Sequence, residues 1–133
     1  MNLIPAYRAP EDKLDSYLAN NEGIQKESLL LKGYVVEIDG TIEGSFQLEE
    51  MEEGVYWLKK LYITKSEAGR LPFLLDAILK LANKKGAKQL FVHSHQPFLD
   101  LLLEALQFRP QNEHAVVDKY RATEGNWWSY SVS

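Results

Sequence analysis

The sequence predicts an α+β fold in which helices pack on the faces of a sheet. Between residues 33 and 63, β-branched and aromatic residues recur with the two-residue period of strands and are interrupted by turn residues. From residue 72 onward, the period of the apolar residues lengthens to about 3.6, which is typical of a helix. We therefore expect the order helix, three antiparallel strands, helix, strand, helix and two strands.

The first half of the chain is predicted to contain a helix and two hairpins. The segment EDKLDSYL places Leu14 and Tyr17 at helical spacing, and residues 20–23 are typical of a loop. Asp39-Gly40 lies between two strand-like runs and accepts the positive φ angles of a two-residue hairpin turn. A second hairpin is predicted to turn within the acidic stretch EEMEEG.

The segment VYWLKKLYI is predicted to be the central strand of the sheet. Strict alternation would place four apolar residues on one face, namely Val55, Trp57, Leu61 and Ile63. It would place Tyr56, Leu58 and Tyr62 on the other face. Because both faces are mostly apolar, we expect this strand to be covered on two sides.

Two helices and three strands are predicted in the second half. Pro72 suits the first position of one helix, and Gly86 suits the left-handed conformation that ends it. QLFVHS is typical of a short strand, and PFLDLLLEALQF is so apolar that we expect a well-buried helix. HAVVDKYR and NWWSYSVS are the last predicted strands. In NWWSYSVS we expect one tryptophan in the core and the other partly exposed at a homodimer contact.

Composition limits the classes of protein to which the chain can belong. It has 133 residues, no cysteine, and a formal net charge of −4. These values exclude disulfides and thiolate metal sites and disfavour nucleic-acid binding. The longest apolar runs have only a few residues, and the amino terminus lacks a basic start followed by an apolar stretch. We predict one cytoplasmic domain over residues 1–133, without a membrane partner.

Residues 33–110 resemble the GNAT N-acyltransferase superfamily. LYIT ends the central strand, LLDAILKLANKKGAKQLFV follows as a helix and strand, and the last helix ends at Leu106-Gln107-Phe108. The order and spacing of these stretches carry the resemblance. It implies a GNAT-like central mixed, mostly antiparallel sheet of about six to seven strands with helices on both faces.

The resemblance also implies an acetyl-CoA site after the central strand. Backbone groups of Leu61, Tyr62 and Ile63 would pair with the pantetheine arm and polarise the thioester carbonyl. The stretch KSEAGRLPF replaces the glycine-rich phosphate loop of the family, retains Gly69, and is about two residues shorter.

Arg70 and Lys65 would offset the missing glycines through direct charge contacts with phosphate. Leu71 cannot replace a glycine where the backbone must approach phosphate closely, and Pro72 has no N–H to donate. The alternative is a plain strand-to-helix turn with solvated charges.

Two further positions depart from the family pattern. Leu103 stands where the family often has a tyrosine that protonates the departing thiolate, and leucine cannot supply a proton. Gln96 stands where the family often has an asparagine that contacts the cofactor, so amide hydrogen bonding is kept with a longer reach.

His93 and His95 are the predicted catalytic bases. They alternate in QLFVHSH, so they share one strand face, and an unperturbed histidine titrates near neutrality. The alternatives are surface histidines, a base at Glu43 or Glu49, and a metal site with His114. Because no carboxylate stands at a fixed spacing from the histidines, we predict no metal.

Two functions remain open from the sequence. One is an N-acetyltransferase that moves an acetyl group from acetyl-CoA, its co-substrate, to an amine acceptor. The other is a catalytically inactive module of the same fold that binds a CoA thioester or a protein partner.

Overall fold

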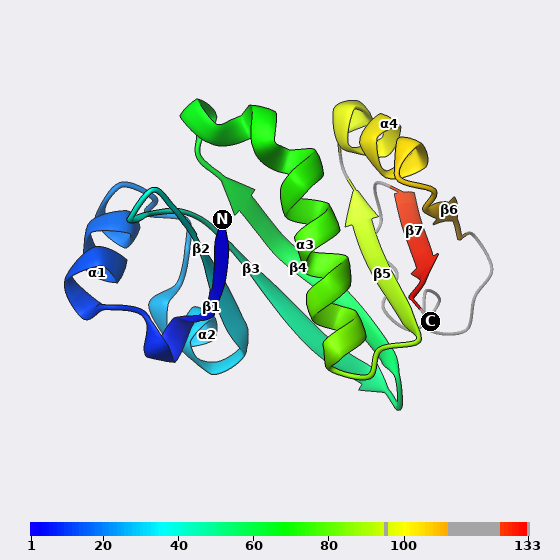
Figure 1. Ribbon diagram of the computed structural model, residues 1–133, viewed down its shortest axis with the longest axis horizontal. Coiled ribbons are helices and arrows are strands. Elements are labelled where there is room, and N and C mark those ends of the chain that lie inside the picture. Colours follow the sequence, from blue (N-terminus) through cyan, green and yellow to red (C-terminus); the bar gives the residue numbers. More distant parts are fainter. Residues whose placement is uncertain (95, 112–125, 133) are drawn as a thin grey trace. The chain divides into compact units, whose positions relative to one another are not determined.

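A seven-stranded mixed sheet is the main element of the computed structural model, which describes residues 1–94, 96–111 and 126–132. The strand order is β1-β2-β3-β4-β5-β7-β6, and Figure 1 follows the elements along the chain from blue to red. The strands are β1 (Asn2–Pro5), β2 (Gly33–Ile38), β3 (Thr41–Glu52), β4 (Val55–Ile63), β5 (Gln89–Ser94), β6 (Arg109–Pro110) and β7 (Asn126–Ser131). The four α-helices of the described residues are α1 (Glu11–Ala19), α2 (Lys26–Lys32), α3 (Leu71–Lys84) and α4 (Pro97–Ala105). The α+β prediction of six to seven strands is confirmed.

Strand directions agree with a mixed, mostly antiparallel sheet. β2 pairs antiparallel with both β1 and β3, and β7 pairs antiparallel with both β5 and β6. β4 pairs parallel with β5 from Val55↔Gln89 to Leu58↔Val92. The fourth of seven strands in the sheet order is β4, as predicted for a central strand.

The predicted turns form at residues that readily adopt a positive φ angle. Asp39 and Gly40 have φ angles of 51° and 81° between β2 and β3, and Gly54 has 77° between β3 and β4. Gly86 has 84° just after α3, where its amide donates to the carbonyl oxygen of Asn83. These residues stop the regular elements where the sequence predicts.

Several elements were not predicted, namely β1, η1 (Ala6–Arg8), α2, η2 (Lys65–Arg70) and β6. β1 is a four-residue strand at the edge of the sheet and ends at Pro5, so its sequence carries little strand signal. The seven-residue α2 lies between the predicted loop and the first predicted strand, in a stretch for which no element was predicted. A short 3-10 helix, η1 (Ala6–Arg8), follows β1. The strand predicted over residues 114–121 lies outside the described residues.

Regular alternation is interrupted in both β3 and β4. Val36 pairs with Gly44 while Glu37 pairs with Ile42, so Glu43 is an extra residue in β3. In β4, Lys60 has a φ of 54°, a left-handed conformation that costs about 1–3 kcal/mol for a residue other than glycine. The regular alternation predicted for β4 is therefore interrupted at Lys60. Tyr56 is buried but Tyr62, beyond Lys60, is 40% exposed.

The chain divides into two compact units. Unit 1 holds Met1–Leu48 and Lys60–Ile78, and unit 2 holds the described residues of Glu49–Lys59 and Leu79–Ser133. β3, β4 and α3 contribute residues to both units. The single domain expected over residues 1–133 stays a prediction.

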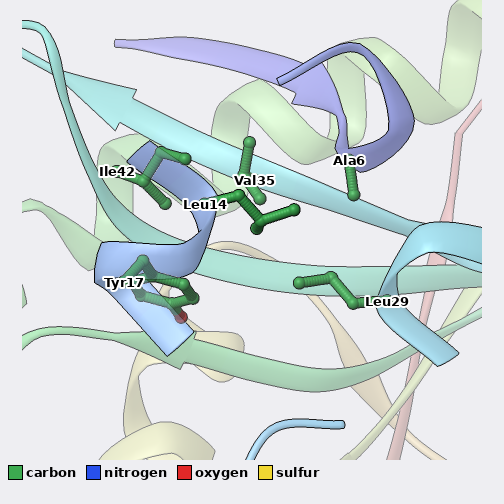
Figure 2. Packing of buried hydrophobic residues seen from close by; sticks show 6 residues of the cluster. All are labelled: Ala6, Leu14, Tyr17, Leu29, Val35 and Ile42. Atoms are coloured by element: carbon green, nitrogen blue, oxygen red, sulfur yellow. The ribbon is translucent and has the colours of Figure 1, made fainter. Parts of the chain in front are cut away.

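Unit 1 has an apolar core between its first two helices and its strands. Figure 2 shows Leu14 and Tyr17 of α1 and Leu29 of α2 pointing toward Val35 of β2 and Ile42 of β3. Ala6 of η1 completes this buried cluster. The core therefore needs both helices, which explains why the short α2 forms despite its length.

Unit 2 has a core built on aromatic residues. Phe91 of β5 and Trp127 of β7 are buried together, with Met51, Val55 and Trp57 packed against them. Trp128 is also buried, and its Nε1 donates to Oδ1 of Asp100 at 2.8 Å. The expectation of a partly exposed tryptophan is therefore wrong, because both tryptophans are buried. The homodimer itself stays a prediction.

The expectation that the last helix is well buried is also wrong. Phe98 and Leu101 of α4 are 64% and 68% exposed, and of its described residues only Leu103 is buried. The nearly continuous apolar sequence of this helix thus leaves apolar side chains in solvent. Among the described residues, no helix is long and apolar enough to cross a membrane.

Gly44 provides a test of how β3 meets β4. A Cβ atom at Gly44 would lie 2.6 Å from the carbonyl oxygen of Tyr62, a backbone atom that cannot move aside alone. We expect Gly44→Ala to lower the free energy of unfolding by about 2 kcal/mol, measured by urea denaturation, because overpacking strains both strands.

Gly69→Ala is the matched control for Gly44→Ala. A Cβ at Gly69 would meet no heavy atom within 4 Å, and Gly69 is not among the described glycines with positive φ. The free energy of unfolding of the Gly69→Ala variant should stay the same or rise slightly. Equal stabilities of the two variants would contradict the close approach of the strands at Gly44.

Candidate functional site

A pocket of about 580 Å³ opens in unit 1 beside the second half of β4. Its walls come from the loop between α1 and α2, from α2, from β3, and from β4. The lining residues are Asn20, Asn21, Gly23, Ile24, Gln25, Leu29, Ser45, Phe46, Gln47, Lys60, Leu61 and Tyr62. The pocket thus combines apolar walls with several amides and a few other polar groups, as small-molecule sites commonly do.

The loop wall of the pocket is tied to the end of α1. The amide of Asn21 donates to the carbonyl oxygen of Tyr17 at 2.7 Å, and that of Asn20 donates to the carbonyl oxygen of Ser16 at 3.1 Å. The backbone N–H of Asn21 bonds the carbonyl oxygen of Leu18. These bonds satisfy carbonyls at the end of the helix and hold the loop in one conformation.

The polar residues of the β3 wall, Ser45 and Gln47, are buried. The Tyr17 hydroxyl and Ser45 Oγ are 2.9 Å apart, and Gln47 Nε2 donates to Ser28 Oγ at 3.0 Å. Burial raises the pKa of Tyr17 from 10.0 to about 12, so its hydroxyl is neutral at physiological pH. Through these pairs, β3 is connected to α1 by one hydrogen bond and to α2 by another.

Charge at the pocket comes from β4. Lys60 is the charged member of the lining set, which contains no acidic residue. Lys60 makes no ion pair with any described residue, whereas the Nζ of its neighbour Lys59 lies 3.0 Å from Glu49 Oε2. The pocket therefore presents a positive charge that no described carboxylate neutralises.

A second hollow of about 430 Å³ in unit 1 contains acidic side chains. Its lining residues include Asp12, Tyr17, Glu43 and Thr64. Thr64 Oγ1 donates to Glu43 Oε2 at 3.4 Å, and the backbone N–H of Thr64 donates to the carbonyl oxygen of Glu43 at 2.9 Å. The extra residue of β3 thus carries a carboxylate that lines an open hollow.

The stretch that the resemblance assigns to phosphate binding is helical. A 3-10 helix, η2 (Lys65–Arg70), leads directly into α3. The backbone N–H of Glu67 bonds the carbonyl oxygen of Thr64, and that of Leu71 bonds the carbonyl oxygen of Ala68. Backbone donors here are therefore used within the helix, instead of pointing together at one bound anion as in a glycine-rich loop.

Arg70 already has a partner on this helix. Its Nε lies 2.8 Å from Glu67 Oε2, and the Arg70 side chain is 52% exposed. Such an exposed pair between residues three apart contributes only about 0.2–0.5 kcal/mol. The guanidinium can exchange Glu67 for a stronger anion at little cost, but the carboxylate remains nearby.

The other predicted site residues lie in unit 2 or outside the described residues. His93 of β5 packs its ring against Trp127, with centroids 4.9 Å apart. Gln96 precedes α4, and its backbone N–H and carbonyl oxygen both bond Ser94 Oγ. Leu103 is buried in unit 2. His95 and His114 lie outside the described residues.

The structure brings together only some of the predicted residues. Leu61 and Tyr62 line the pocket, Ile63 follows on β4, and Gly69, Arg70 and Leu71 lie on the next helical segment of the same unit. Within residues 1–94, 96–111 and 126–132, no three histidine, aspartate or glutamate side chains gather as metal ligands.

Sequence reasoning missed most of the pocket. Ser45 and Gln47 alternate with Phe46 in β3, and polar residues at every second position predict a solvent-facing side. The unpredicted α2 covers that side instead. Asn20 and Asn21, just after α1, were predicted to form a loop, but nothing in the sequence predicted that this loop lines a pocket.

Comparison with known proteins identifies the fold. No protein-family model matches the sequence, and no curated protein is significantly similar to it. Solved structures do match. N-acetylglutamate synthase from Neisseria gonorrhoeae, complexed with coenzyme A and N-acetyl-glutamate, aligns with 99% of this chain at 17% identity and a TM-score of 0.72. This chain covers 35% of that protein.

Two smaller proteins match along nearly their whole length. The N-acetyltransferase PseH from Campylobacter jejuni, in complex with acetyl coenzyme A, has 14% identity and a TM-score of 0.72, with 99% of each chain covered. An acetyltransferase of the GNAT family from Staphylococcus aureus has 13% identity and a TM-score of 0.70, also with 99% of each chain covered. The chain therefore has the fold of the GNAT acetyltransferases.

Proposed function

We propose that this chain is an acetyl-CoA-dependent N-acetyltransferase that acts on an amine. The observation that supports it is the pocket beside Leu61 and Tyr62, at the second half of the central strand of a GNAT fold. Solved structures with this fold contain coenzyme A or acetyl coenzyme A. A pocket at this strand would hold the amine next to the thioester.

The reaction needs a new C–N bond and a broken C–S bond. The acceptor nitrogen attacks the thioester carbonyl, the acceptor loses a proton to a base, and coenzyme A leaves as a thiol. Backbone N–H groups of Leu61, Tyr62 or Ile63 would stabilise the charge that develops on the carbonyl oxygen. Fixed donors are effective there because they need no reorganisation during the reaction.

Phosphate binding in this chain would depend on side-chain charge. Because η2 uses backbone donors internally, Gly69 and Leu71 supply less to a phosphate than a glycine-rich loop would. Arg70, with Lys65 at the start of η2, would supply the positive charge, and Glu67 would oppose it. Gln96 would add an amide contact.

The proton would be taken by His93 or His95. Glu43 is the alternative base, since it lines the hollow that also contains Tyr17 and Thr64. No group on Leu103 can protonate the departing thiolate, so the thiolate would leave unassisted or with a solvent proton.

A second candidate function is binding of a CoA thioester without transfer. The helical η2 and the Arg70–Glu67 pair favour it, because both reduce the phosphate-binding capacity expected of an active member of the fold. The two functions differ in whether thiol is released when an amine is added.

Thermal unfolding with acetyl-CoA or free coenzyme A tests the proposed cofactor. A ligand at a hundred times its dissociation constant adds about 2.7 kcal/mol of stability, so the unfolding midpoint should rise measurably. Thiol release with a panel of amines then separates transfer from binding. An unchanged midpoint at millimolar concentrations of both ligands would contradict both CoA-dependent functions.

Arg70 and Glu67 should have opposite effects on coenzyme A affinity. Arg70→Ala should weaken binding several-fold and make it less sensitive to salt, because one charge contact with phosphate is lost. Glu67→Gln should strengthen binding several-fold, because a carboxylate near the phosphates is removed. Titration calorimetry at two salt concentrations measures both.

Lys84→Ala is the matched control for Arg70→Ala. Lys84 is an exposed cation in the last turn of α3, the helix that follows η2. Removal of the Lys84 side-chain charge should leave the affinity for coenzyme A unchanged. If Arg70→Ala binds coenzyme A as the parent does, Arg70 is a solvated residue and phosphate is held elsewhere.

Replacement of His93 by Gln tests the proposed base. A positioned base contributes about a hundred- to ten-thousand-fold, so kcat/KM should fall by that factor and lose its rise with pH. Affinity for acetyl-CoA should not change, because the base touches the amine. His95→Gln and Glu43→Gln are measured alongside, and a large loss only in Glu43→Gln would move the role to that carboxylate.

A further inference from the structure

Lys60 combines three features that no other residue of β4 combines. It has a positive φ in the middle of a strand, it lines the large pocket of unit 1, and it makes no ion pair with a described residue. Glycine or asparagine would adopt this φ more easily than lysine. A long cation at a strained position beside a pocket indicates a binding role for the side chain.

The remaining polar groups of the pocket suit an anion. Its lining residues include Asn20, Asn21, Gln25 and Gln47. The amide nitrogens of Asn20, Asn21 and Gln47 each make one hydrogen bond within the protein, and a primary amide has a second N–H that can donate to a ligand. No lining residue is acidic. An anionic group that enters the pocket therefore meets one ammonium and several donors, whereas a second cationic group would be repelled.

The apolar wall limits the size and shape of the ligand. Ile24, Leu29, Phe46 and Leu61 line the same pocket, whose volume of about 580 Å³ admits a small molecule with an apolar side chain. Such a wall would bury a hydrocarbon group of the ligand while its polar groups face the amides and Lys60.

We propose that this pocket binds the carboxylate of a small amino-carboxylic acid through Lys60 and the neighbouring amides. The assignment of this molecule as the acetyl acceptor rests on the proposed N-acetyltransferase function. Binding of the carboxylate does not, because it depends only on the pocket itself. Amines with a further positive charge, such as polyamines, are expected to be poor ligands.

Two matched sets of compounds test the carboxylate. For binding, N-acetyl-L-leucine is compared with N-acetyl-L-leucinamide by titration calorimetry with the full chain and no cofactor. For transfer, L-leucine, L-leucinamide and 3-methylbutylamine are compared as acceptors by thiol release. We expect the carboxylate compound to be preferred about tenfold or more in each set, as for a hydrogen bond to a charged group.

Variants at neighbouring lysines assign the preference to Lys60. Lys60→Asn removes the charge and keeps a residue that accepts positive φ, so the fold is kept. Lys60→Asn should abolish the preference for the carboxylate compounds, and Lys60→Arg should retain that preference. Lys59→Asn is the control, because Lys59 is adjacent but pairs with Glu49 and does not line the pocket. It should leave the preference unchanged.

The two proposals fail in different ways. If N-acetyl-L-leucine binds in a Lys60-dependent manner and none of the acceptors causes thiol release from acetyl-CoA, the pocket assignment is supported and the transferase is overturned. Transfer to all three acceptors at equal rates, unchanged in Lys60→Asn, would overturn the pocket assignment and leave the transferase. Absence of binding of either N-acetyl compound at millimolar concentrations would also overturn the pocket assignment.

Discussion

The close approach of Gly44 to the carbonyl oxygen of Tyr62 is the constraint on which the site depends. It occurs where β3 contains the extra residue Glu43 and where β4 contains Lys60 in a left-handed conformation. A side chain at position 44 would push apart the two strands at this point. The irregularities turn Glu43 toward one hollow and leave Lys60, Leu61 and Tyr62 beside the pocket.

Buried polar bonds hold the wall of that pocket in place. Ser45 and Gln47 are almost fully buried, and their partners are Tyr17 of α1 and Ser28 of α2. Inside a protein, a polar group that loses its partner costs about 1–3 kcal/mol, so these pairs fix where each helix sits on β3. The apolar core of Figure 2 supplies most of the burial, and the polar pairs select one arrangement of it.

The sequence predicted the parts of the fold that local chemistry determines. Asp39-Gly40, Gly54 and Gly86 stop elements because they accept positive φ, and this requirement is visible in the residues themselves. Lys60 adopts the same conformation without such a signal, so its effect on β4 could not be foreseen. The short α2 is also stabilised by tertiary packing and not by its own propensity.

The same distinction applies to the candidate site. Leu61 and Tyr62 were named from the resemblance, on a recognisable strand; the structure places them at a pocket, and their role in cofactor binding stays a prediction. The amides of residues 20–25 could not be predicted, because loop residues carry no periodic pattern and their role emerges only after the helices pack. His93 could be located in sequence, but its packing against Trp127 depends on the pairing of β5 with β7.

Two cations of unit 1 differ in what a ligand must displace to reach them. Arg70 is bound to Glu67 by an exposed pair, and an anion that takes the guanidinium must overcome both that weak pair and the remaining carboxylate. Lys60 has no ion-pair partner among the described residues, so an anion meets its full charge. A charge-assisted bond to Lys60 therefore needs no exchange of protein partners, whereas one to Arg70 does. On this comparison an anion displaces less at the pocket than a phosphate would at η2, so the proposed coenzyme A binding would depend on how far Arg70 can leave Glu67.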